Sequence, residues 1–195
     1  MILFNSMRCL AKLEDDQYKK TKITHTRIIT RAIILNDKDE ICLLHLLGDD
    51  LFGHRDYYET PGGGIKENET LEESLLREIK EETGIDCDII SPIGFVDDYY
   101  NAIYRHNMNY YYLCKAKSYG KPSLEDYEKT IINGMTFVSI DKAIEIYENM
   151  NKEKIEILVS RRELPVLRKA KEMLEKKDAW VFQNTRDRKK HPKRF

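Results

Sequence analysis

Residues 63–85 read GGIKENETLEESLLREIKEETGI, and this stretch carries most of the information on structure and function. Its fixed positions follow the pattern G-x5-E-x7-R-E-U-x-E-E-x-G-U, in which U is an apolar residue. They are filled by Gly63, Glu69, Arg77, Glu78, Ile79, Glu81, Glu82, Gly84 and Ile85. At average usages of roughly 6–7% per residue type, the seven positions that demand one type arise by chance in about a few windows per billion. The stretch is therefore a motif.

The second half of this stretch predicts a helix over about residues 71–83. Thr70 and Glu73 form a capping box, with a hydroxyl at the N-cap and a carboxylate three residues later. Gly84 stands where a left-handed residue would end the helix. No proline or glycine interrupts the residues between these two signals.

Three carboxylates share one face of this helix, because Glu78, Glu81 and Glu82 stand at positions i, i+3 and i+4. Their mutual repulsion costs roughly a few tenths of a kcal/mol per pair. A divalent cation removes that cost, and hard oxygen ligands suit Mg²⁺ or Mn²⁺. A solvated acidic face is the alternative interpretation. The run PGGG at residues 61–64, just before the helix, favours the metal, because glycine lets the backbone approach a ligand closely.

The motif resembles the signature of the Nudix hydrolases. The resemblance implies a metal-dependent pyrophosphatase acting on a nucleoside diphosphate linked to a further group. It also implies an α/β fold, an α/β/α sandwich around a mixed β-sheet. The family core would cover residues 22–150, with an N-terminal segment at 1–21 and a helical extension with a basic tail at 151–195. The terminal segments would pack on the core or form a homodimer contact.

The metal site is predicted at Glu78, Glu81 and Glu82, and the resemblance adds the carbonyl of Gly63 as a further ligand. The resemblance also implies a glutamate outside the motif, for which Glu125 and Glu128 are the candidates. Solvated loop residues are the alternative for both.

Catalysis is predicted to be attack of water on phosphorus, with the metals neutralising the pyrophosphate and a carboxylate taking the proton. Glu78 is the first choice for this general base and Glu69 the second. Arg77, with its planar fork of donors, is expected to orient a neighbouring glutamate such as Glu69.

Substrate contacts are predicted at Tyr100, Tyr104 and Glu128, although aromatic strand residues also serve as core. Among the Nudix hydrolases that the chain resembles, ADP-ribose hydrolases tend to carry a proline beyond the motif, and dinucleoside polyphosphate hydrolases tend to carry a tyrosine there. The chain has no proline between Pro92 and Pro122, which weakens the ADP-ribose interpretation.

Hydrophobic patterning indicates a mixed α/β chain. Strands are expected at 23–35 and 41–47, joined as a hairpin, and at 86–96, 108–117 and 135–139. Loops are expected at 48–60 and 118–134. Helices are expected at 141–150 and 152–177, the last with a break near Pro165.

Composition sets the remaining bounds. The chain has 195 residues, and 33 Lys and Arg nearly balance 34 Asp and Glu, so charge gives no general attraction to nucleic acid or membrane. Its four cysteines form no C-x-x-C pair, and the N-terminus lacks the pattern of a signal peptide, which together favour the cytoplasm. The tail RDRKKHPKRF at 186–195 is basic, and it is either a solubilising end or a contact for RNA or substrate phosphates.

The leading function is hydrolysis of the pyrophosphate linkage of a nucleoside triphosphate or nucleoside diphosphate derivative. A second enzymatic version is pyrophosphohydrolysis at an RNA 5′ end, which only the basic tail supports. A non-catalytic nucleotide-sensing module is a third version, and the complete set of glutamates in the motif argues against it.

Overall fold

The computed structural model of the protein describes residues 7–150 and 153–190, with side chains described as far as residue 176. The strands are β1 (Cys9–Leu13), β2 (His25–Leu35), β3 (Ile41–Asp50), β4 (Gly53–Glu59), β5 (Gly62–Gly64), β6 (Ile85–Tyr100), β7 (Arg105–Tyr119) and β8 (Ile132–Val138). The helices are α1 (Leu71–Thr83), the 3-10 turn η1 (Asn101–Ile103), α2 (Glu128–Ile131), α3 (Ile140–Asn149) and α4 (Lys154–Lys190).

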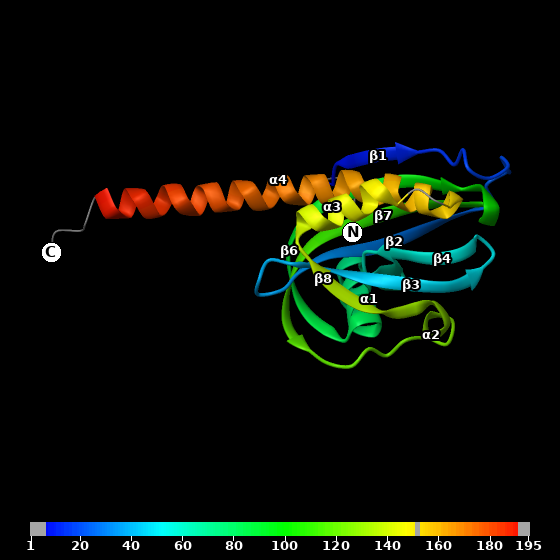
Figure 1. Ribbon diagram of the computed structural model, residues 1–195, viewed down its shortest axis with the longest axis horizontal. Coiled ribbons are helices and arrows are strands. Elements are labelled where there is room, and N and C mark those ends of the chain that lie inside the picture. The colour runs from blue at the N-terminus through cyan, green and yellow to red at the C-terminus, as the bar shows by residue number, and fades with distance from the viewer. Residues whose placement is uncertain (1–6, 151–152, 191–195) are drawn as a thin grey trace.

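The strands form one mixed sheet in the order β1-β6-β7-β2-β3-β4, with β5 paired to β2 and β8 paired to β3. The pairs β1–β6 and β2–β7 are parallel, and the other pairs are antiparallel. Two buried apolar clusters lie on the two faces of this sheet. One packs α1 against the sheet, and the other packs α3 and α4 (Figure 1). The predicted α/β/α sandwich around a mixed sheet is thereby confirmed.

The hairpin predicted between β2 and β3 is confirmed at its turn, where the N–H of Asn36 donates to the carbonyl of Glu40 at 2.9 Å. The two strands pair only at Leu35 and Ile41 and then separate, because β2 pairs with β7 and β5 while β3 pairs with β4 and β8. The loop expected at 48–60 is wrong, since most of that range lies in β3 and β4. Glycine there allows the turn between two paired strands and does not mark a long loop.

The last helix is longer than expected, and it has no break near Pro165. A proline inside a helix costs about 3 kcal/mol. The residues that follow it, Val166 and Leu167, are fully buried against the sheet. Burying such a side chain stabilises the fold by about 1.5–3 kcal/mol, so tertiary packing offsets the cost of the proline.

The two ends of the chain extend the central fold. β1 adds an edge strand to the sheet, the first half of α4 packs into the core, and the second half projects beyond the sheet (Figure 1). The division at residues 22 and 150 stays a prediction. Of the predicted basic tail, residues 186–190 continue α4, and residues 191–195 lie outside the described part. In the described part of the chain, no helix is long and apolar enough to cross a membrane.

Candidate active site

Helix α1 begins and ends at the predicted residues. Thr70 Oγ1 accepts a hydrogen bond from the N–H of Glu73 at 3.1 Å, and the carboxylate of Glu73 accepts one from the N–H of Thr70 at 2.8 Å. Gly84 ends the helix in the left-handed conformation, with φ of 73°. Leu75 and Ile79 are fully buried against the sheet. This packing fixes the rotation of α1 about its axis, and so sets the direction in which its glutamates point.

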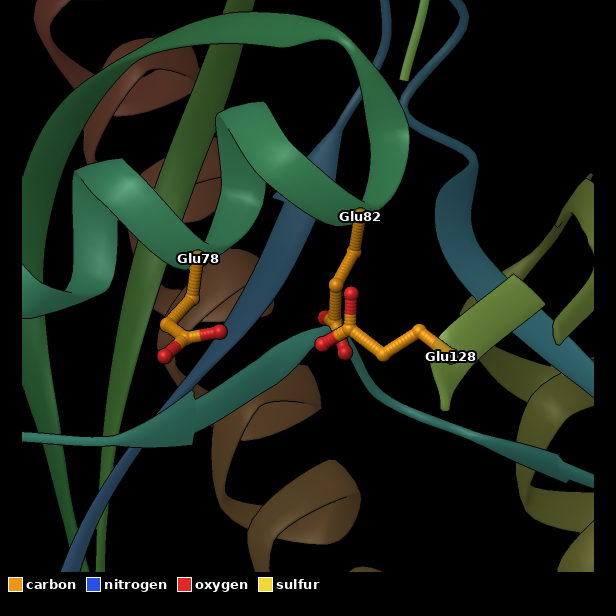
Figure 2. Close-up of side chains that lie close together, drawn as sticks. All are labelled: Glu78, Glu82 and Glu128. Atoms are coloured by element: carbon orange, nitrogen blue, oxygen red, sulfur yellow. The ribbon is translucent and has the colours of Figure 1, made fainter. Parts of the chain in front are cut away.

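Three carboxylates meet beside the glycine run. Oxygen atoms of Glu78, Glu82 and Glu128 all lie within 4.8 Å of one another. Glu78 and Glu82 extend from α1, and Glu128 reaches toward them from the short helix α2 (Figure 2). The backbone N–H of Gly62 donates to Glu82 Oε2 at 2.6 Å, which ties the glycine run to the same group.

This carboxylate triad, Glu78, Glu82 and Glu128, fits a divalent metal ion. Burial raises the pKa of Glu82 well above its usual range, and the neighbouring Glu78 raises it further. Burial also raises the pKa of Glu78. Close, buried carboxylates of this kind are unfavourable without a cation, and their oxygens suit Mg²⁺ or Mn²⁺.

Two predicted metal ligands lie differently in the structure. Glu81 is outside the triad, because its carboxylate accepts from Arg77 Nη1 at 2.9 Å and faces Lys66 at 3.9 Å. Gly63 lies directly against Glu78, where a Cβ would be 2.5 Å from the carboxylate oxygen Oε2. The metal roles of Glu81 and of the Gly63 carbonyl stay predictions.

Arg77 contacts Glu69, the pairing expected from the sequence. Its Nε donates to Glu69 Oε1 at 2.5 Å and its Nη2 donates to Oε2 at 2.8 Å, so the guanidinium holds both oxygens. These hydrogen bonds, together with one from the N–H of Lys66, lower the pKa of Glu69 to about 2. The same arginine donates from Nη1 to Glu78 at 2.7 Å. Arg77 therefore links Glu69 to the triad, while its part in catalysis stays a prediction.

A cleft of about 400 Å³ lies beside the triad, between the diverging strands β2 and β3. Its walls include four arginines, Arg27 and Arg31 on β2, Arg55 on β4 and Arg105 on β7. None of these arginines was predicted from the sequence. The alternation Arg27-x-Ile29-x-Arg31 in an otherwise apolar strand was an available signal, because it places two cations on one face of the strand.

The predicted tyrosines do not line this cleft. Tyr100 is a core residue with 4% exposure, and its hydroxyl accepts from Arg162 Nη1 at 3.1 Å. Tyr104 is exposed and lies in the turn that follows η1. The aromatic side chain in the cleft is instead that of Tyr127, in the loop before α2. Glu125 also lines the cleft, 3.6 Å from Lys66.

Comparisons with known proteins agree with this architecture. The model of the NUDIX domain family matches residues 25–159. RNA pyrophosphohydrolase of Orientia tsutsugamushi is 37% identical over 76 residues, which are 39% of this chain and 45% of that protein. 8-oxo-dGTP diphosphatase of Proteus vulgaris is 57% identical over 41 residues, 20% of this chain and 37% of that protein. Nudix hydrolase 5 of Arabidopsis thaliana is 26% identical over 92 residues, 47% of this chain and 30% of that protein. The matched regions thus span less than half of these relatives.

Solved structures show the same fold. A NUDIX hydrolase from Nitrosomonas europaea has a TM-score of 0.55 and 17% identity, covering 71% of this chain and 88% of that one. A MutT NUDIX hydrolase from Burkholderia pseudomallei has a TM-score of 0.51 and 22% identity, and the match covers 60% of this chain and 86% of that one. Because the family model matches well over half of the chain, from residue 25 to residue 159, the protein belongs to the Nudix family of hydrolases.

Proposed function

We propose that the protein is a divalent-metal-dependent pyrophosphohydrolase. Its substrate is a nucleoside triphosphate or a nucleoside diphosphate derivative. The observation that carries this proposal is the carboxylate triad at the side of an arginine-lined cleft. Carboxylates hold a cation and arginines hold phosphate, and a pyrophosphate linkage needs both.

Glu78, Glu82 and Glu128 would hold the metal, which is Mg²⁺ or Mn²⁺. When bound, such an ion neutralises phosphate charge and lowers the pKa of bound water. The Gly62 N–H orients the carboxylate of Glu82. Arg77 restrains Glu78 from the other side, so the ligands are positioned before substrate arrives.

Glu78 is the better candidate for general base. Arg77 donates only to its Oε1, which leaves Oε2 to accept the proton of a water molecule. Glu69 has both oxygens held by Arg77 and a pKa of about 2, which makes it a weak base. Water then adds to phosphorus, the bridging P–O bond breaks, and two phosphate-bearing products leave.

A panel of nucleotides tests the proposal, with phosphate release measured in Mg²⁺, in Mn²⁺ and after EDTA treatment. At least one nucleotide should be hydrolysed with metal and none after EDTA. Glu78→Gln should lose the activity, whereas Glu145→Gln, on the exposed face of α3, should keep it. Full turnover in a metal-stripped sample would contradict the metal-dependent mechanism. Tight nucleotide binding without hydrolysis would favour the sensing module.

RNA 5′-end pyrophosphohydrolysis is the second candidate, favoured by the similarity to the RNA pyrophosphohydrolase of Orientia tsutsugamushi. A 5′-triphosphorylated RNA in the same panel separates the two functions. Preference for that RNA over every free nucleotide would assign the RNA function.

A further inference from the structure

The arginines of the cleft differ in how their charges are balanced. Arg31 forms an ion pair with Glu59 at 3.2 Å, and Arg55 forms one with Asp50. These two guanidiniums are neutralised within the protein. They can line the cleft, but their charges are already compensated.

Arg27 and Arg105 have no such partner, because neither forms an ion pair with any residue of the described chain. Arg27 is exposed, and the Nε of the half-buried Arg105 lacks a hydrogen-bond partner among the described residues. Asp98 lies near enough to attract Arg105, but its carboxylate accepts hydrogen bonds from Asn107 and from Asn109 Nδ2, the latter at 3.0 Å.

The two uncompensated arginines come together through the parallel pairing of β2 and β7. Arg105 lies opposite His25, two residues along the same strand from Arg27. Their side chains share one face and repel each other, and burial, followed by this repulsion, lowers the pKa of Arg105. A bound anion would remove the repulsion, as a bound metal would for the carboxylates.

The glycine run places Arg27 beside the carboxylate triad. A Cβ on Gly64 would lie 2.5 Å from Arg27 Nη2, and a Cβ on the preceding Gly63 would lie 2.5 Å from Glu78. Two adjacent glycines thus make room for a cation on one side and a metal-binding carboxylate on the other. Arg27, Arg105, Glu78 and Glu82 all line the one cleft, so an anion at the arginines and a pyrophosphate at the triad would share it.

We propose that Arg27 and Arg105 form a subsite for a terminal phosphate adjoining the pyrophosphate at the triad, so that the preferred substrate carries three or more phosphates in a chain. This inference rests on the function proposed above. Such a subsite would distinguish polyphosphate substrates, such as nucleoside triphosphates, from nucleoside diphosphates that end in a neutral sugar.

Binding of non-hydrolysable analogues tests the subsite directly. A methylene-bridged nucleoside triphosphate and the matching diphosphate are titrated calorimetrically into the full-length protein with Mg²⁺. Hydrogen bonds to charged groups are strong enough that the triphosphate should bind about tenfold more tightly or better. Equal affinities for the two analogues would overturn the proposal.

Variants show whether the arginines cause that difference. Arg27→Gln and Arg105→Gln should each weaken triphosphate binding by about tenfold while changing diphosphate binding by less than about threefold. Arg27→Lys, which keeps the charge, should retain part of the preference. Arg168→Gln is the matched control, because it removes an exposed arginine on α4 that pairs with Glu148. Equal losses for both analogues would contradict the subsite.

Kinetics separates this inference from the proposed function. The wild-type kcat/KM should favour a nucleoside triphosphate over UDP-glucose, and Arg27→Gln should reduce that preference mainly through KM. If the wild type hydrolyses pyrophosphate linkages but the arginines do not discriminate, only the subsite is wrong. If it hydrolyses none, the proposed function fails. If Arg105→Gln has a lower melting temperature than the wild type, the variants of the exposed Arg27 alone test the subsite.

Discussion

Gly63 faces the carboxylate of Glu78 so closely that a Cβ on the glycine would lie 2.5 Å from Oε2. The contact explains why glycine stands at this position of the motif even though its backbone is not in the left-handed region. A side chain there would occupy the space of a group that we assign to metal binding.

Gly63→Ala should therefore reduce kcat by about a hundredfold, because a displacement on the order of 1 Å can cost that much in a preorganised site. The matched control is Gly120→Ala, whose added Cβ would be 3.2 Å from its nearest neighbour, the carbonyl of Gly84, and which does not line the cleft. Steady-state rates on the best nucleotide of the panel give the measurement. Near-native turnover of Gly63→Ala would show that Glu78 can move without loss.

Glu125 lies in the loop before α2 and Glu128 is the first residue of that helix, but of the two only Glu128 joins the triad. Glu128→Gln should weaken Mg²⁺ binding by about tenfold or more, since it removes a charged ligand of a hard cation. Glu125→Gln keeps the triad and should change the affinity little. The midpoint of the rise in melting temperature with Mg²⁺ reports the affinity. Identical Mg²⁺ midpoints for the two variants would show that Glu128 is not a metal ligand.

Local interactions made α1 predictable. Thr70, Glu73 and Gly84 act within one or two turns of the residues that they cap, so the sequence alone specifies both ends of the helix. The motif also indicated Glu78 and Glu82, because their spacing on one helix fixes their relative positions. For these residues, sequence neighbours are also spatial neighbours.

The rest of the cleft depends on contacts between distant segments. Glu128 reaches Glu82 only because α2 precedes β8, which pairs with β3, and no local pattern encodes that approach. Arg27 and Arg105 meet through a parallel pairing of strands far apart in the chain. Tyr100 was a plausible substrate contact by position alone, but the strand turns its side chain to the face that α4 covers. Sheet register is the information that a single sequence lacks.

Glu59 should make stability depend on acid pH. Burial alone would raise the pKa of Glu59, but Arg162 and Arg31 outweigh it and lower the pKa from 4.5 to about 2. A carboxyl whose folded pKa is below its unfolded value stabilises the fold above the unfolded pKa, and this contribution is lost as the pH falls through the folded pKa. Glu59→Gln should reduce the free energy of unfolding by on the order of 3 kcal/mol at neutral pH.

The difference between wild type and Glu59→Gln should shrink as the pH falls from 4.5 toward 2. Urea unfolding at a series of pH values measures it. Glu148→Gln, which removes an exposed ion pair with Arg168, should show almost no effect at any pH. A constant difference across the acid range would mean that Glu59 does not titrate as assigned.

Deletion of residues 186–195 should leave hydrolysis of small nucleotides intact, because the motif lies about a hundred residues upstream of this basic segment. If the segment instead contacts RNA, its deletion should weaken RNA binding and flatten the salt dependence of that binding. Nucleotide turnover and RNA affinity at several salt concentrations are the two measurements. A large drop in turnover of free nucleotides would assign the tail to the active site.

Glu163 connects α4 to the segment that leads into the glycine run. It is fully buried, and its carboxylate accepts from Thr60 Oγ1 and from the hydroxyl of Tyr111, each at 3.0 Å. It also accepts from Arg162 Nε at 3.0 Å. Thr60 comes two residues before Gly62, so the buried charge supports the segment that positions Glu82.

Glu163→Gln should therefore lower the free energy of unfolding by about 3–5 kcal/mol, because removing one partner leaves the charge of Arg162 poorly compensated in the interior. Glu172 lies on the exposed face of the same helix and pairs with Lys169 at the surface, so Glu172→Gln should cost less than about 1 kcal/mol. Urea unfolding of the two variants compares a buried with an exposed carboxylate on one element. If both variants lose the same small free energy of unfolding, the contacts of α4 with the sheet do not depend on the charge of Glu163. Helix α4 would then support the glycine run through apolar packing alone.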